Sequence, residues 1–164
     1  MRAILDQLRV ILQEELEVYK KLLDITLTKK DVITENRIQE LDKMTQVEQS
    51  LIMKIGKLEE SREKLVDQMG KRIGLKDFGM RELIDHLEDK DKSFFVEIRE
   101  DLLRTLNRIH DGNDLNKVLI EDSLEFVNLN LDLLTSVGQS DNYKQTAEDP
   151  GQVKPSKSLF DVKI

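Results

Sequence analysis

Apolar residues recur every three or four positions from the start of the chain, which is typical of long amphipathic helices. In the first segment they form one broad stripe: Ile4, Leu5, Leu8, Ile11, Leu12, Leu16, Tyr19, Leu22 and Leu23. Charged side chains occupy the opposite side, and the polar run Lys29-Lys30-Asp31 follows. The pattern predicts a first helix over about residues 2–28.

The second segment has the spacing of a coiled-coil seam, with a cap expected at Asn36. Its seam positions are Leu41, Met44, Glu48, Leu51, Ile55, Leu58, Arg62, Leu65 and Met69. We predict a helix over about residues 37–70 that forms an antiparallel hairpin with the first. The two charged seam positions, Glu48 and Arg62, are too far apart to pair along one helix. Each therefore needs a neighbouring element or water, and Glu59 is one local partner for Arg62.

Two further helices are predicted after the glycines at 70, 74 and 79. One is short, over residues 80–88, and the other is long, over residues 94–138. The run from Asp111 to Asp114 lowers helix propensity because it includes Gly112. We expect a bend there rather than a break.

Beyond Gly138 the composition changes to Gly, Ser, Asp, Pro and Lys, and a small apolar cluster closes the chain at Leu159-Phe160-Asp161-Val162. This composition predicts a flexible C-terminal tail over residues 139–164. The remainder, residues 1–138, is expected to be one all-α domain. We predict an elongated antiparallel coiled coil or helical bundle of long helices with one short helix.

The last helix is apolar on two sides. One group comprises Leu115, Val118, Leu119, Phe126, Leu129, Leu133 and Val137. A second, rotated by about 120–140°, comprises Ile120, Leu124, Val127, Leu131 and Leu134. Small polar residues at heptad spacing run between the two groups: Asn116, Ser123 and Asn130.

The two apolar groups have different expected partners. The second aligns with upstream apolar positions and should pack on the first two helices together with Phe95, Ile98, Leu102, Leu106 and Ile109. The first has no evident internal partner except the tail or the short helix near Leu83. Seven large side chains left in water would forgo about 1.5–3 kcal/mol each. We therefore predict that the first group receives an amphipathic helix of another protein. A helix sandwiched within its own bundle or a homodimer is the alternative.

Composition narrows the classes of partner and compartment. The chain has 26 Lys and Arg against 33 Asp and Glu, a formal net charge of −7, so nucleic acid and anionic membranes are poor partners. It has no cysteine, which excludes disulfides and thiolate chemistry. The start lacks the apolar stretch of a signal peptide and no membrane-spanning run occurs, which predicts a soluble intracellular protein with no membrane insertion.

Catalytic or cofactor chemistry is not expected. The two histidines, His86 and His110, lack the Glu-x-x-His spacing of helical metal sites, so we predict no metal. No glycine-rich phosphate loop or nucleophile motif occurs, so we predict no cofactor and no enzyme activity. Tyr143, an aromatic residue placed by this reading in the polar tail, either docks on its own protein or anchors a partner.

The chain resembles the FlgN-type flagellar export chaperones over most of its length. The resemblance in the second helix rests on Ile38-Gln39-Glu40-Leu41, Glu48, Leu58-Glu59 and Arg62-Glu63-Lys64-Leu65. It is more specific in the last helix, at Asn113-Asp114-Leu115-Asn116-Lys117-Val118-Leu119-Ile120 and Ser123-Leu124-Glu125-Phe126-Val127. The tail is similar at Tyr143, Gly151 and Leu159-Phe160-Asp161-Val162-Lys163-Ile164. Gly112 departs from the pattern, because a better helix former is expected there.

The resemblance implies a cytoplasmic chaperone that holds helical terminal segments of the hook–filament junction proteins. It would prevent premature assembly and deliver these flagellar hook-associated proteins to the type III export apparatus. The family binds clients through its C-terminal helix, which corresponds here to Leu115, Val118, Leu119, Phe126, Leu129, Leu133 and Val137. A family tyrosine that engages the export gate corresponds to Tyr143.

The competing hypothesis is a structural coiled-coil protein that self-associates through its C-terminal helix. A tight dimer that buries this face would favour the structural role. A monomer or a weak homo-oligomer would favour the chaperone. The sequence does not identify the client.

Overall fold

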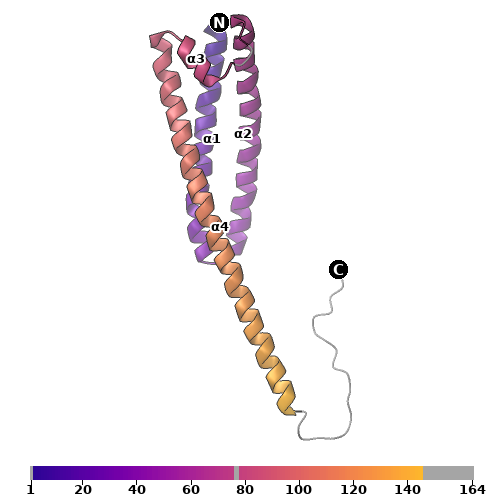
Figure 1. Ribbon diagram of the computed structural model, residues 1–164. Coiled ribbons are helices and arrows are strands. Elements are labelled where there is room, and N and C mark those ends of the chain that lie inside the picture. The colour runs from indigo at the N-terminus through magenta and orange to yellow at the C-terminus, as the bar shows by residue number, and fades with distance from the viewer. Residues whose placement is uncertain (1, 76–77, 146–164) are drawn as a thin grey trace. The chain divides into compact units, whose positions relative to one another are not determined.

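The computed structural model describes residues 2–75 and 78–145, with no side chains described for residues 136–145. The described residues form four helices, α1 (Arg2–Thr34), α2 (Ile38–Ile73), α3 (Met80–His86) and α4 (Asp89–Gln145) (Figure 1). The all-α prediction is thus confirmed. The chain divides into two compact units, Met1–Ser123 and Leu124–Ile164. The division into a domain over residues 1–138 and a tail over residues 139–164 stays a prediction.

Helices α1 and α2 lie side by side as an antiparallel hairpin (Figure 1). Two ion pairs fix its register. Arg62 Nε donates to Glu15 Oε1 at 3.1 Å, and Lys29 Nζ donates to Glu48 Oε2 at 2.5 Å. From Glu15 to Lys29 the position on α1 advances by fourteen residues, and from Arg62 to Glu48 the position on α2 goes back by fourteen. Both pairs therefore belong to one antiparallel register. Of the alternatives left open for the two charged seam positions, both residues pair with the neighbouring helix, and Arg62 uses Glu15 of α1 rather than Glu59.

The core of the first unit lies where α1, α2, α3 and the first part of α4 meet. One cluster of buried side chains comprises Ile4, Leu5, Leu8, Leu12, Leu16, Val66, Met69, Leu83, Ile84, Phe95 and Ile98. A second cluster comprises Val18, Tyr19, Leu22, Leu23, Ile55 and Ile109. The apolar stripe predicted for the first helix is therefore its buried face. Among the described residues, no helix is both long and apolar enough to cross a membrane.

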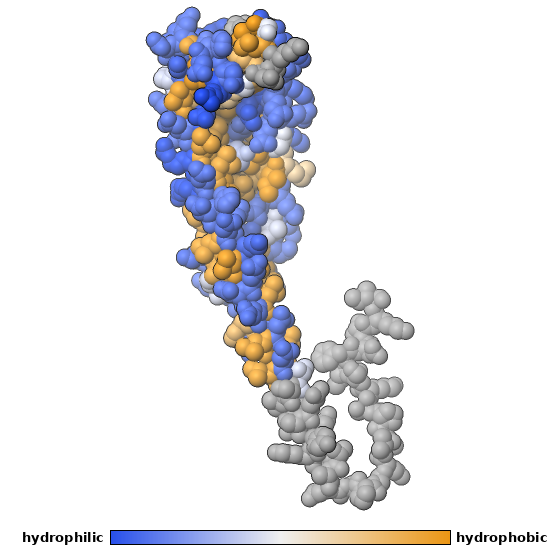
Figure 2. Space-filling view, in the orientation of Figure 1, coloured by the Kyte–Doolittle hydropathy of each residue, from blue (hydrophilic) through white to orange (hydrophobic). Residues whose placement is uncertain are grey.

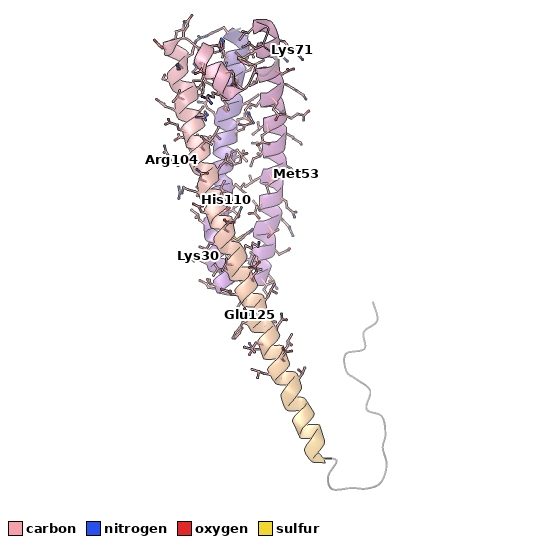
Figure 3. The ribbon with its side chains drawn as sticks, in the orientation of Figure 1. Lys30, Met53, Lys71, Arg104, His110 and Glu125 are labelled. Atoms are coloured by element: carbon pink, nitrogen blue, oxygen red, sulfur yellow. The ribbon has the colours of Figure 1, made fainter. Side chains whose placement is uncertain are left out.

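The first helix is longer than predicted, because α1 continues through the polar run to Thr34. Val32 and Ile33 are buried, so the apolar stripe resumes after the run. Within the run, Lys29 lies against α2 and pairs with Glu48, while Lys30 is exposed (Figure 3). The charged run therefore did not end the helix, because one of its residues pairs with α2 and the others are exposed.

Asn36 ends α1 and does not cap α2, which corrects the predicted role of this residue. Its φ is 53°, in the left-handed region. The Asn36 N–H donates to the carbonyl of Ile33 at 3.1 Å, and the Arg37 N–H donates to that of Val32 at 3.0 Å. This is the hydrogen-bond pattern of a Schellman C-cap, a position that asparagine tolerates. Helix α2 begins without a side-chain cap.

The last helix begins at Asp89, five residues before the predicted start, and ends at Gln145 rather than near Gly138. Its first turn is held to α1 by Asp91, whose carboxylate accepts from Arg2 at 2.8 Å and from Arg9 at 2.6 Å. Helix α3 ends two residues before its predicted end and α2 three residues beyond. Helix α4 continues through Gly112 without a break.

Candidate functional site

The first part of α4 packs on the hairpin much as its sequence predicted. Phe95, Ile98 and Ile109 are buried, and Leu102 packs against both clusters of the core. Leu106 is exposed, because it faces the open side of the three-helix arrangement. A groove of about 180 Å³ lies there, lined by Leu12, Glu15, Tyr19, Glu59, Arg62, Met80, Ile98, Arg99, Leu102, Leu103 and Leu106.

The charged groups of this groove already have partners. Burial raises the pKa of Glu15, and the nearby Arg62 guanidinium only partly opposes this. Tyr19 donates its hydroxyl to Glu59 at 2.9 Å, and burial, followed by that carboxylate, raises the pKa of Tyr19. The network joins α1 to α2 and gives a donor to both the buried carboxylate of Glu15 and the half-buried carboxylate of Glu59. We therefore assign it to holding the hairpin together.

Helix α4 approaches α1 very closely at Gly112. A Cβ atom added there would lie 2.6 Å from Cγ2 of Thr26, which is too close for two carbons. One turn later, Asn116 donates its Nδ2 hydrogen to the carbonyl of Thr26 at 2.9 Å and is only 4% exposed. The glycine that departs from the family pattern is thus explained by the contact it permits. Its cost in helix propensity is offset by close packing.

The buried seam of α4 continues into the small polar line as far as Asn116, which the sequence did not predict, whereas Ser123 is half-buried and Asn130 is exposed. Thr105, Ile109 and Asn116, at steps of four and seven residues, are buried. The two apolar groups flank this line. The expectation that the second group packs on the first two helices is wrong at Ile120, which is exposed. The other members of that group, Leu124, Val127, Leu131 and Leu134, are exposed as well.

The predicted client-binding face is largely exposed. Exposed side chains of this face are Leu115, Val118, Phe126, Leu129 and Leu133, and Leu119 is half-buried. Phe126 is 66% exposed, which is unusual for a phenylalanine. Figure 2 shows hydrophobic surface, in orange, along the later part of α4. We call the seven predicted residues, Leu115 to Val137, the client face.

Two predicted residues cannot be placed in this way. The side chains of Val137 and Tyr143 lie outside the described residues. The backbone of Tyr143 belongs to α4, which ends two residues later. The expectation that Tyr143 follows the helix in a polar tail is therefore wrong, and its proposed role stays a prediction.

Acidic side chains border the client face. Residues 111–135 contain six acidic residues and one basic residue, Lys117. Asp114, Glu121, Glu125 and Asp132 follow one another along α4 at steps of seven, four and seven residues, and all four are exposed. Glu125 points away from the helix in Figure 3. We call these four residues the acidic edge.

One carboxylate lies inside the client face, and the sequence prediction missed it. Asp122 follows Leu115 by seven residues and precedes Leu129 by seven, so the three share one position of the heptad. Val118 and Phe126 are its neighbours one turn before and one turn after. Asp122 is exposed and makes no ion pair in the described part of the chain. The heptad spacing was the signal that could have found it.

This arrangement offers an exposed surface that a partner could bind. In the described part of the chain, no group of three or more His, Asp or Glu side chains could hold a metal ion. His110 Nδ1 lies 3.2 Å from Asp114 Oδ2 and 4.0 Å from Asp111 Oδ1 on an exposed turn. The features that stand out are an exposed apolar helix face, its acidic edge and one carboxylate within it.

Comparison with known proteins gives one family. The family model described as FlgN protein matches residues 1–151. No curated protein and no solved structure matches the chain.

Proposed function

This chain belongs to the FlgN family, whose model covers most of its length, and from that premise we propose its function. It holds helical segments of flagellar export clients on the client face of α4. Membership implies a flagellar export chaperone, and the family is a chaperone family rather than an enzyme family. The clients are the hook–filament junction proteins. The chaperone acts in the cytoplasm, where it keeps their helical ends from assembling prematurely.

The observation that carries this proposal is the exposure of the client face. Between Leu115 and Leu133 its large apolar side chains extend over about 27 Å of helix. Covering each of them would contribute about 1.5–3 kcal/mol. An amphipathic helix laid along α4 would supply apolar side chains at the same three- and four-residue spacing. Free α4 thus offers a surface that another helix can complete.

A chaperone must also release its client. An α4 face that pairs with one client helix buries less than a complete helical bundle would. We therefore expect moderate affinity, which permits dissociation at the export apparatus. Tyr143, near the end of α4, is proposed to engage the export gate and so to separate delivery from holding.

Replacing Phe126 and Leu133 by Asp tests the client face. Two carboxylates in place of apolar contacts should weaken binding of a purified hook-associated client at least about a hundredfold. The measurement is titration calorimetry, with circular dichroism to show that the variant is folded. The matched control is Val47→Asp with Met53→Asp on α2, since both of these apolar residues are exposed there as well. Undiminished binding by the folded Phe126→Asp, Leu133→Asp variant would overturn the proposal.

Light scattering separates the chaperone from a self-associating coiled-coil protein. A monomer or a dimer that dissociates on dilution supports the chaperone. A tight dimer that survives dilution, and that the same double substitution disrupts, would assign the client face to a second copy.

Tyr143→Ala tests the division between holding and delivery. Client affinity should stay within about twofold, because the residue lies beyond the client face, whereas capture by the export gate should fall. Equal loss of both interactions would contradict this division. Client affinity and capture by the export gate are both measured with the full chain.

A further inference from the structure

We propose that the client face selects a cationic helix, one that carries a Lys or Arg within its apolar stripe to meet Asp122 and further basic side chains to meet the acidic edge. This inference rests on the proposed function and adds to it the chemistry of the partner. It identifies the partner by charge and pattern rather than by name.

The first step concerns Asp122. A helix docked on Leu115, Val118, Phe126 and Leu129 covers Asp122, because these side chains surround it on α4. Covering a carboxylate with apolar groups alone removes its hydration without compensation, and such burial is strongly unfavourable. A basic side chain at the facing position of the partner supplies the missing charge and hydrogen bonds. A single charged position within an apolar seam also fixes register and partner choice.

The second step concerns the acidic edge, whose carboxylates have spare capacity. In the described part of the chain, Glu121, Glu125 and Asp132 make no ion pair. Exposed acidic residues on the hairpin differ, because several pair with a lysine on the same helix: Glu17 with Lys20, Glu60 with Lys64 and Asp67 with Lys71. The acidic edge therefore repels itself and attracts cations. Basic residues flanking the partner's apolar stripe would neutralise it.

The same charges argue against a second copy of the chain as the occupant. The region between 111 and 135 has a formal charge of −5, from six acidic residues and one lysine. Two copies paired through this face would bring acidic edges and Asp122 residues together in one interface. Juxtaposed like charges disfavour such a pairing. Net charge therefore favours a basic partner over self-association.

Two synthetic peptides test the inference directly. Both carry the same Leu and Ile heptad stripe. One has Lys at the central stripe position and at the flanks, and the other has Gln at those positions. We expect the Lys peptide to bind the full chain at least tenfold more tightly at low salt, equivalent to about 1.4 kcal/mol. The preference should shrink as salt is raised, because exposed pairs are screened. Fluorescence anisotropy measures both affinities.

Asp122→Asn is the decisive variant. It should reduce the preference for the Lys peptide severalfold while leaving or improving the affinity for the Gln peptide, because a buried charge is removed. Asp24→Asn on α1 is the matched control, since Asp24 is also exposed and unpaired. That control should change neither affinity.

The outcomes separate this inference from the proposed function. Equal binding of both peptides, lost from both in the Phe126→Asp, Leu133→Asp variant, would overturn the charge preference and leave the docking face in place. Binding of neither peptide would contradict both proposals. A preference for the Lys peptide that Asp122→Asn leaves unchanged would overturn the role of Asp122. A dimer that neither peptide dissociates would assign the face to a second copy.

Discussion

Two phenylalanines on α4 show how differently one helix is used along its length. Phe95 is 0% exposed, in the cluster where α4 meets α1 and α3, whereas Phe126 is 66% exposed. Both segments are rich in apolar residues. Around Phe95 the apolar positions form one stripe that a hairpin can cover. Around Phe126 they form two, and the described residues of the Leu124–Ile164 unit are a single helix, which cannot bury its own faces.

The charges differ between the same two regions. Asp91 lies near the start of α4, is almost fully buried and accepts hydrogen bonds from two arginines of α1. Arg9 also lies over the rings of Phe94 and Phe95. Asp132 is exposed and makes no ion pair in the described part of the chain. The first region thus satisfies its polar groups internally, while the second leaves them available to a partner.

The largest expected effect comes from truncating the two phenylalanines. Phe95→Ala should lower the free energy of unfolding by about 3–5 kcal/mol, because it leaves a cavity in a closed core. Phe126→Ala should change it by less than about 0.5 kcal/mol, because that ring is already in water. Urea unfolding followed by circular dichroism measures both. Comparable losses in the two variants would show that Phe126 is covered within the free protein.

The next comparison uses the two aspartates. Asp91→Asn should lower the free energy of unfolding by about 1.5–3 kcal/mol, because two charge-assisted hydrogen bonds are weakened and Arg9 loses its counter-charge. Asp132→Asn should have little effect. The same urea titrations, repeated at high salt, provide the check. Asp91→Asn as stable as the parent would mean that the arginines do not hold α4 to α1.

Gly112 lies between the two regions and gives the third prediction. In an open helix Gly→Ala stabilises by about 1 kcal/mol. Here the new methyl group would collide with Cγ2 of Thr26, so Gly112→Ala should instead destabilise by about 1–2 kcal/mol.

Thr26→Ser supplies the control for Gly112→Ala. It removes the Cγ2 methyl group but keeps the hydroxyl that donates to the carbonyl of Leu22. In that background Gly112→Ala should be neutral or stabilising, and a double-mutant cycle measures the coupling. Additive effects of the two substitutions would show that α4 does not approach α1 closely at this point.

Most of the fold could be predicted from the sequence because apolar residues recur at the three- and four-residue spacing of helices. The stripe from Ile4 to Leu23 and the charged seam positions Glu48 and Arg62 were interpretable without coordinates. Boundaries were less predictable. At Lys29 a polar run ended the predicted helix, yet one of its residues pairs with Glu48 and the helix continues. At Asn36 one residue type suits both a C-cap and an N-cap, and local sequence does not decide between them.

The apolar surfaces of α4 could be predicted from the sequence, but not which side of this helix faces α1. The helical periodicity of the sequence located both apolar groups of α4, but it could not show that Asn116, between them, is buried. That outcome depends on a close approach of α4 to Thr26, a tertiary contact with no local signal except Gly112. Asp122 does not appear in a pattern of apolar positions alone, although it occupies the same heptad position as Leu115 and Leu129.

The smallest expected effect concerns a buried carboxylate of the hairpin. Burial raises the pKa of Glu15, so the folded protein holds this proton more tightly than the unfolded chain does. The resulting contribution to stability is complete below the ordinary pKa of about 4.3 and is lost as the pH rises through the raised value. Relative to the parent, Glu15→Gln should therefore gain stability with rising pH.

Glu60 provides the opposite case for the same measurement. A hydrogen bond from Lys64 lowers the pKa of this exposed carboxyl, so its small contribution is present above the ordinary pKa and is lost as the pH falls. Relative to the parent, Glu60→Gln should lose a little stability as the pH rises, the reverse of Glu15→Gln. Urea midpoints from pH 4 to pH 7 compare the three proteins. Parallel curves for Glu15→Gln and the parent would mean that Arg62 fully compensates the burial of Glu15. Ionising this carboxylate in the hairpin would then cost no more than ionising an exposed carboxylate of α4.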